Sequence, residues 1–265
     1  MWPDQDPSSG WPQPPPPPQL ARLRSDDKVA ELSDEGVLVR RPVAMDRVKD
    51  LRAVIFCYNE LLFGTTKLDN TNMGEDFRKF QKVAEECVKK HTSLANKRDP
   101  TSSSSISIVY FFVSAEPHER CIEVARQLEL GGSVQHSDCL DPNISQPDSK
   151  HIPADELISK GVSVVSDCTP HQKAQVVEGI QKECKGKVMY IGKDSGDVLA
   201  FQGSDVSLCY QFPAHDPHAL SEVDGILVKP DWRPIERFFE VATSDPVGEE
   251  EEGPGEKCKC ICAVM

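Results

Sequence analysis

Hydrophobic positions follow two alternating patterns through the middle of the chain. Short apolar runs of strand length alternate with longer segments whose apolar residues recur every three or four positions, which is the helical spacing. The runs predict strands at residues 53–58, 107–113, 162–165, 187–191, 206–210 and 225–228. The periodic segments predict helices at residues 74–91, 117–130, 153–159, 169–183, 195–201 and 232–242.

Alternating strands and helices are typical of an α/β fold. Helical crossovers join parallel strands, so we expect a Rossmann-like, mostly parallel sheet flanked by helices. In such folds ligands bind at the carboxyl ends of the strands. The residues that follow each predicted strand are therefore the first place to look for chemistry.

The two ends of the chain have a different composition from its centre. Residues 1–45 include the proline run Pro14–Pro18, which favours an extended polyproline helix and predicts a disordered arm. That run would suit a polyproline-binding domain (SH3, WW, EVH1 or profilin), or it is a plain solvated tail. Residues 46–243 form the expected domain, and residues 244–265 form an acidic, flexible tail.

Charge and hydropathy exclude some classes of protein. The formal net charge is −13, which disfavours nucleic acid as a partner. No apolar run approaches the roughly 20 residues of a membrane-spanning helix, and the N-terminus lacks the basic and apolar regions of a signal peptide. Ten cysteines occur without a C-x-x-C pair, which argues against zinc and for reduced thiols in the cytosol.

Chemically capable residues stand at the expected strand ends. Cys57 lies at the end of the first strand and Ser114 follows the second. Lys173 lies in a helix that opens with threonine and proline, and Lys193 to Asp197 follow the fourth strand. A hydroxyl, a lysine and an acidic loop at these places resemble the haloacid-dehalogenase-like superfamily. The detail resembles the phosphorylation domain of P-type cation-transporting ATPases.

Four stretches carry the resemblance, which covers roughly residues 50–243. Residues 169–179, TPHQKAQVVEG, are similar to the family's T-S-P-Q-Q-K helix, and residues 192–210 are similar to its hinge, G-D-G-V-N-D-x-P-A-L. Residues 115–130 resemble the helix after its T-G-D motif, and residues 223–228 resemble its A-D-x-I-L-L stretch. The resemblance implies a site made of Lys173, a hydroxyl at Ser114 and a magnesium-binding hinge.

This sequence departs from the family at the catalytic positions. Cys57 stands where the family has the aspartate that attacks ATP, and Asn59 matches the superfamily's acid/base. Lys193 replaces a magnesium-binding aspartate, and Asp197 is the hinge acid that remains. Mg²⁺ needs oxygen ligands, so we expect neither a metal nor another cofactor. If a metal binds, Asp194 and Asp197 are its ligands.

The replacements leave several interpretations open. Lys193 would mimic the charge of the lost cation by pairing with Asp194 or Asp197, and Lys173 is either solvated or paired with Asp197. Cys57 is either an inert packed thiol or a nucleophile, although the arginine that cysteine phosphatases carry six positions later is Phe63 here. About 50 residues separate the first two strands, which leaves no room for the family's nucleotide-binding domain.

The last residues match a lipidation signal. Cys262-Ala263-Val264-Met265 has the form of a prenylation box, and a terminal methionine favours a farnesyl group. Cys258 and Cys260 offer palmitoylation sites, and the tail resembles those of Ras-type small GTPases. Stable anchoring needs two such signals. The alternative is a chance tail with reactive thiols.

These observations predict a pseudoenzyme on the cytosolic face of a membrane. It would be a degenerate P domain, held by lipids, that binds or regulates another protein, such as a cation pump or a partner of Pro14–Pro18. The rival is an active Mg²⁺-dependent phosphohydrolase, with Cys57 or water as nucleophile, Lys173 for phosphate, and Asp194 with Asp197 for the metal. A third interpretation is a remnant domain without a specific ligand.

Overall fold

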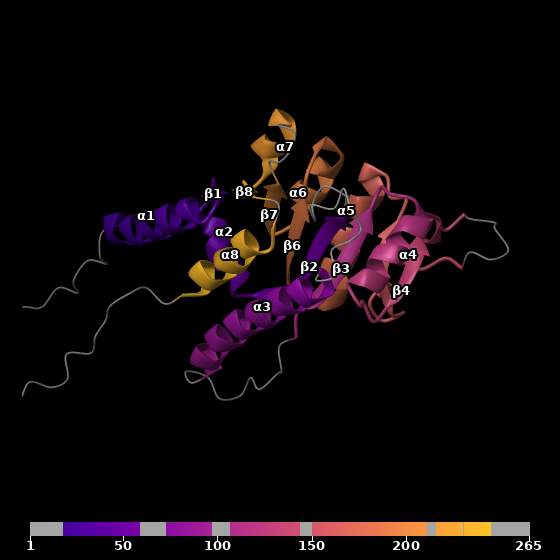
Figure 1. Ribbon diagram of the computed structural model, residues 1–265, viewed down its shortest axis with the longest axis horizontal. Helices are drawn as coiled ribbons and strands as arrows, with labels where there is room; N and C mark the ends of the chain where they lie inside the picture. The colour runs from indigo at the N-terminus through magenta and orange to yellow at the C-terminus, as the bar shows by residue number, and fades with distance from the viewer. Residues whose placement is uncertain are drawn as a thin grey trace, which may run out of the picture.

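A computed structural model describes residues 18–58, 73–96, 107–143, 150–210, 216–229 and 231–244. Within these residues the chain forms one eight-stranded sheet with helices on both faces (Figure 1). The strand order is β1-β8-β7-β6-β2-β3-β5-β4. The strands are β1 (Val37–Val39), β2 (Leu51–Tyr58), β3 (Val109–Ser114), β4 (Ser133–His136), β5 (Val162–Ser166), β6 (Lys187–Gly192), β7 (Val206–Tyr210) and β8 (Gly225–Leu227).

All neighbouring strands are parallel except β1, which pairs with β8 in the antiparallel sense. The predicted mostly parallel α/β fold is therefore confirmed. β2 lies at the centre between β6 and β3, with Phe56 opposite both Ile191 and Phe112. The carboxyl ends of these three strands consequently meet at one edge of the sheet.

Helices cover the sheet from both sides. They are α1 (Pro18–Asp34), α2 (Val43–Val48), α3 (Met73–Asn96), α4 (His118–Gln127), α5 (Pro170–Cys184), α6 (Val198–Gly203), α7 (Pro217–Glu222) and α8 (Arg233–Thr243). Successive residues of β2 point into opposite cores: Val54 and Phe56 face one, Ile55 and Cys57 the other. A strand buried on both faces needs apolar residues at nearly every position, so such strands read as continuous apolar runs.

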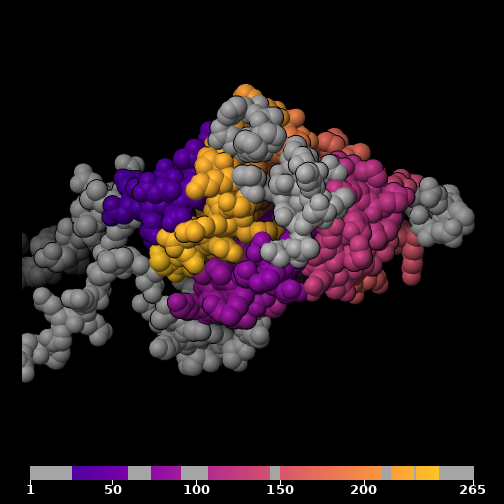
Figure 2. All heavy atoms as spheres, in the orientation of Figure 1, coloured from indigo at the N-terminus to yellow at the C-terminus, as the bar shows by residue number. Residues whose placement is uncertain are grey.

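Aromatic side chains join α3 and α8 to the sheet. Phe80 of α3 is fully buried and lies with its ring centroid 5.7 Å from that of Phe56 and 5.4 Å from that of Trp232. Phe239 of α8 meets Phe80 edge-on at 5.8 Å. Edge-on and offset contacts of this kind add to the energy of apolar burial. They hold α3 against α8, as the adjoining purple and yellow surfaces in Figure 2 show.

The folded domain begins earlier than the sequence predicted. Residues 1–45 were expected to form a disordered arm, but within them Leu32 of α1, Val37 of β1 and Ala44 of α2 are fully buried. β1 completes the sheet edge beside β8, and the amides of Arg40 and Arg41 donate to the carbonyl of Asp224. Three-residue strands are too short for hydrophobic periodicity to reveal. Pro14–Pro17 lie outside the described residues.

The predicted strands from 53–58 to 225–228 are all present, but β4 and α7 were missed. β4 lies at the sheet edge and reads Ser-Val-Gln-His, without the apolar run of a central strand. α7 is six residues long, with Asp216 as its side-chain cap and proline in its first turn. Its start signal is present in the sequence, but a helix this short buries too few residues to show a period.

Candidate functional site

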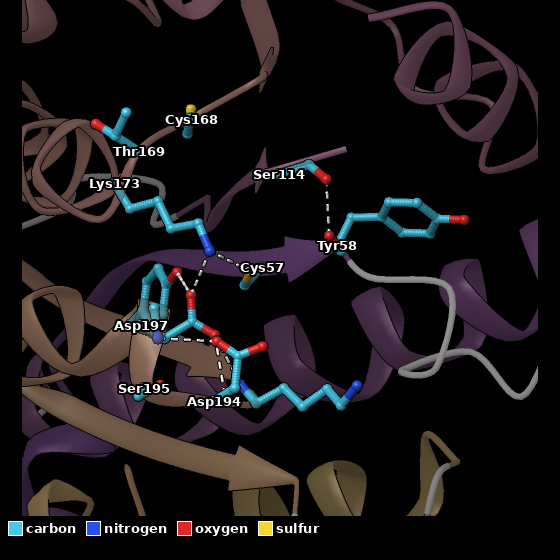
Figure 3. A network of polar contacts seen from close by, with 12 residues as sticks. Cys57, Tyr58, Ser114, Cys168, Thr169, Lys173, Asp194, Ser195 and Asp197 are labelled. Carbon is cyan, nitrogen blue, oxygen red and sulfur yellow. Dashed lines mark hydrogen bonds and ion pairs between the residues drawn. The ribbon is translucent and has the colours of Figure 1, made fainter. Parts of the chain in front are cut away.

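The residues singled out in the sequence meet at the carboxyl ends of β2, β3 and β6 (Figure 3). Cys57 is the residue before the last in β2, and Ser114 is the last residue of β3. Lys173 reaches toward Cys57 from the first turns of α5, and Asp197 rises from the loop after β6 to the same point. The topology thus brings together residues that are distant in the chain, such as Cys57 and Lys173, which lie 116 positions apart.

The start of α5 is held by a capping box. The Thr169 hydroxyl accepts a hydrogen bond from the Gln172 amide, while the Gln172 side chain accepts one from the Thr169 amide. Pro170 occupies the first turn, where a missing N–H costs nothing. Just before this cap, the Cys168 amide donates to the Ser114 carbonyl at 2.7 Å. α5 is therefore anchored to the end of β3, which places Lys173.

Asp197 is a buried carboxylate with donors on both oxygens. Its Oδ1 accepts from Lys173 Nζ at 2.8 Å and from the Tyr190 hydroxyl at 2.8 Å. Its Oδ2 accepts from the backbone amides of Lys193 at 2.8 Å and Asp194 at 3.4 Å. Gly192 makes room for this arrangement, because a Cβ there would lie 2.7 Å from Asp197 Oδ2.

Lys173 and Asp197 form a buried ion pair. Their exposed fractions are 4% and 0%. Burial alone would raise the pKa of Asp197, but Lys173 and the hydrogen bonds to the carboxylate outweigh it and hold that pKa below its ordinary value. Burial alone would likewise lower the pKa of Lys173, but the hydrogen bonds to Cys57 and Asp197 and the charge of Asp197 reverse this and raise it. Both groups are therefore charged at neutral pH.

Cys57 is a neutral thiol in contact with this pair. Lys173 Nζ lies 3.3 Å from Cys57 Sγ. Burial, followed by the negative charge of Asp197, raises the pKa of Cys57 well above its ordinary value despite the nearby ammonium. Because the thiolate is the nucleophilic form of cysteine, a thiol in this state is a poor nucleophile. The geometry favours the packed-thiol interpretation of Cys57.

Lys193 and Asp194 contribute differently from the sequence-based expectation. Lys193 meets Asp197 through its backbone amide, and the ammonium at Asp197 belongs to Lys173. Asp194 accepts from the Gly196 amide at 2.9 Å and caps the short turn at Ser195–Asp197. The hypothesis that Lys193 mimics a cation by pairing with Asp197 is therefore replaced, because Lys173 holds that place.

Ser114 is engaged with the backbone. Its hydroxyl donates to the Tyr58 carbonyl at 2.8 Å and accepts from the Glu116 amide at 2.9 Å, and the residue is fully buried. These bonds tie the ends of β2 and β3 to each other. Ser114 thus serves the local structure of the site. Asn59, which the sequence matched to the superfamily's acid/base, lies outside the described residues.

The side chains at this edge do not fit Mg²⁺. That ion requires near-octahedral oxygen ligands, usually including carboxylates. Each oxygen of Asp197 already accepts two hydrogen bonds, and an ammonium stands beside it. Throughout the described part of the chain, no three His, Cys, Asp or Glu residues are grouped so that they would hold a metal ion.

Two members of the site were missed in the sequence. Tyr190 lies inside an apolar run, so the sequence indicated only a core residue. Its place two residues before Gly192 puts it on the same face of β6 as the site. Asp216 accepts from the Ser195 amide at 2.7 Å as well as capping α7, so it joins the loop after β6 to that helix. Its position before proline was an available signal.

The lipidation residues Cys258, Cys260 and Cys262 lie outside the described residues. The described helices include none with the length and apolar character needed to cross a membrane. The last described residue, Ser244, lies beside α1, where its carbonyl accepts from Lys28 Nζ at 2.8 Å. The described chain therefore ends next to α1.

Solved structures resemble this fold, whereas no family model and no curated protein matches the chain. Two structures of a zinc-transporting PIB-type ATPase, in different states, match with a TM-score of 0.50 and 9% identity, over 83% of this chain. The match spans 45% of that ATPase. The catalytic domain of the CPx-ATPase CopB-B matches at 13% identity and a TM-score of 0.46, over 82% of this chain and 99% of that one. At such identities the likeness shows the fold alone, which is that of a P-type ATPase domain.

Proposed function

We propose that this chain is a catalytically silent P-domain-like module, anchored by lipids to the cytosolic face of a membrane, where it binds or regulates another protein. One observation carries the loss of catalysis. At the position of the attacking aspartate stands Cys57, a buried neutral thiol in contact with the Lys173–Asp197 ion pair. A cation pump and a polyproline-binding protein are the candidate partners.

The chemistry of phosphoryl transfer supports this proposal. The reaction needs a nucleophile, positive charge on the transferred phosphoryl group, and usually a metal ion. Cys57 is protonated, the charge of Lys173 is neutralised by Asp197, and each oxygen of Asp197 already accepts two hydrogen bonds. The same set of contacts therefore opposes all three requirements. The rival phosphohydrolase would have to break those contacts first.

Phosphate release by the full chain tests catalytic silence. We would offer p-nitrophenyl phosphate, acetyl phosphate and ATP, each with Mg²⁺, and compare the chain with its Cys57→Ser and Lys173→Ala variants. We expect equal background release in all three proteins. Turnover that requires Mg²⁺ and disappears in Lys173→Ala would overturn the proposal in favour of the phosphohydrolase.

A second variant probes whether the nucleophile alone is missing. Cys57→Asp restores the carboxylate at the end of β2, but it leaves Asp197 bonded to Lys173 and to two backbone amides. We expect no acid-stable, hydroxylamine-sensitive phosphoenzyme from labelled ATP. A trapped aspartyl phosphate would mean that the ion pair opens readily and that the site retains catalytic capacity.

Lipid attachment is tested by fractionation of the full chain expressed in eukaryotic cells. Cys262→Ser removes the prenyl acceptor and should move the protein from the membrane to the soluble fraction. The paired variant Cys258→Ser with Cys260→Ser keeps the prenyl group and should weaken membrane retention, because one lipid gives only marginal binding. Unchanged fractionation of Cys262→Ser would rule out the lipid anchor.

Partner binding is tested at the proline run. Replacement of Pro14–Pro18 by alanine removes the polyproline helix, and we expect it to abolish binding to a panel of purified SH3, WW and EVH1 domains and profilin. A chain that binds none of them in its natural form would remove this run from the proposal. Co-purification with a cation pump, measured on membranes, then tests the other candidate partner.

A further inference from the structure

The Lys173–Asp197 pair joins two separate parts of the chain at the site. Lys173 belongs to α5, whereas Asp197 belongs to the loop that connects β6 to α6. In Figure 3 the lysine side chain extends from α5 until its nitrogen lies between Cys57 and Asp197. Tyr190 and the amides of the loop complete the ring of donors around the carboxylate.

We propose that the Lys173 ammonium is a built-in cation that keeps the loop after β6 closed on α5 without any ligand. In the family that the sequence resembles, a lysine at this place accompanies a hinge loop that also binds Mg²⁺, whereas here Lys193 replaces a magnesium-binding aspartate and the Lys173 ammonium is paired with Asp197. The inference rests on the proposed function in one respect: only a site without phosphoryl transfer can keep its lysine permanently paired. It adds that the closed state is independent of magnesium and phosphate.

The energetics of buried charge support the proposal that this ion pair holds the loop closed, an arrangement called the lock below. Each ion of a buried pair loses its hydration at a large cost, and the pair persists only where further hydrogen bonds satisfy the charges. Asp197 meets that condition with three donors besides Lys173. Removing one partner alone leaves an uncompensated charge in the interior, which is strongly destabilising. Neither partner can therefore leave for an external ligand without opening the site.

The same geometry predicts which molecule would replace the lysine. Lys173→Ala removes three methylene groups and the ammonium, and leaves a space that ends at Asp197 Oδ1, Cys57 Sγ and the Tyr190 hydroxyl. A carboxylate at the end of a narrow, buried space recognises a primary alkylammonium ion. Propylammonium has the length of the lost atoms, whereas tetramethylammonium has the charge but no N–H donor.

Thermal unfolding of the full chain tests the lock. The natural chain should have the same Tm with and without millimolar Mg²⁺, inorganic phosphate or propylammonium. Lys173→Ala should lose about 10 °C in Tm, because breaking a buried pair has a large cost. Propylammonium should restore a substantial part of that loss, and tetramethylammonium at the same ionic strength should restore none. Lys173→Met, which fills the space without a charge, should be destabilised and should not respond to propylammonium.

Three results would overturn the inference. They are a rise in the Tm of the natural chain with Mg²⁺, a Lys173→Met variant as stable as the natural chain, and a lack of rescue of Lys173→Ala by propylammonium. If Lys173→Ala does not fold alone, it is refolded with and without propylammonium, and recovery only with the amine supports the lock. Phosphate release measured on the same samples separates the two proposals, since turnover by the natural chain contradicts the proposed function whatever the Tm values show.

Discussion

Raising the pH from about 7.5 to about 10 should destabilise this protein strongly, because its interior holds several protonated thiols. Burial raises the pKa of Cys168 and of Cys209 to about 12, and it raises that of Cys57 well above its ordinary value. All three are at most 3% exposed. In the unfolded chain a cysteine thiol has a pKa of about 8.5.

The sign and the size of the effect follow from linkage. A group whose folded pKa is raised contributes stability that is complete below its unfolded pKa and is lost as the pH rises toward the folded pKa. For all three thiols the window opens at about pH 8.5, and for Cys168 and Cys209 it extends to about pH 12. At about pH 10 each costs about 1.5 to 2 kcal/mol, and the three together about 5 kcal/mol. That is a large share of the free energy of unfolding of an ordinary domain, which is roughly 5–15 kcal/mol.

Urea unfolding at the two pH values, with reductant present, measures this loss. A domain of this size has a urea m-value of about 2 to 3 kcal/mol/M, so these three thiols alone should lower the midpoint by about 2 M. Tyrosine side chains titrate at about pH 10 and above in the unfolded state, so the measurement stays at or below that value. The control is a triple variant in which alanine replaces Cys57, Cys168 and Cys209.

We expect the triple variant to be less stable at about pH 7.5, because it loses packing atoms. Its midpoint should fall less between the two pH values, and the fall that remains comes from other buried thiols such as Cys121, whose pKa burial raises to about 11. Equal midpoints at both pH values in the natural chain would refute the reasoning about buried thiols. An equal fall in the triple variant would transfer the effect to other groups, with Cys121, Cys139 and Cys184 the first to examine, because burial raises the pKa of each to about 11.

Three substitutions test the packing of the fold by urea unfolding. Gly179→Ala should cost about 3 kcal/mol, because the new Cβ would lie 2.2 Å from the carbonyl oxygen of Ala154. The control Gly203→Ala, whose Cβ would lie 3.8 Å from its nearest neighbour, should change stability by less than about 1 kcal/mol. Similar costs for the two variants would refute the close approach of α5 to Ala154. Thr169→Ala should cost about 1 kcal/mol through loss of the capping box, and Thr169→Ser should keep most of that stability. Equal stabilities of Thr169→Ala and the natural chain would contradict a role for the cap. Phe80→Ala should cost about 3 to 5 kcal/mol, and a cost below about 1 kcal/mol would contradict its central place among the aromatic rings.

The central strands and most helices could be predicted from the sequence. Both faces are buried in the strands β2, β3, β5, β6 and β7. Such strands appear in the sequence as continuous apolar runs, which can be recognised without the structure. The helices α3, α5 and α8 likewise follow from apolar spacing and from cap signals at Thr169 and Pro234. Because parallel strands place their carboxyl ends together, the location of the site followed as well.

The boundary of the domain could not be predicted in this way. The N-terminal segment from α1 to α2 belongs to the fold because β1 pairs with β8 and because Leu32 and Val37 are buried, and both are contacts with residues far away in the chain. Local periodicity carries no information about such contacts when the elements are only a few residues long. The edge strand β4 and the short helix α7 were missed for the same reason.

The sequence by itself determined which chemical groups stand at the strand ends: a thiol in place of a carboxylate, a lysine at the start of α5, and a reduced set of acids after β6. Only the tertiary structure decided what those groups do to one another. It selected Lys173 over Lys193 as the partner of Asp197, added Tyr190 to the carboxylate, and held Cys57 as a neutral thiol. The physical reason is that ion pairing and pKa depend on distance and burial, and these arise from contacts between segments that the order of residues in the chain does not reveal.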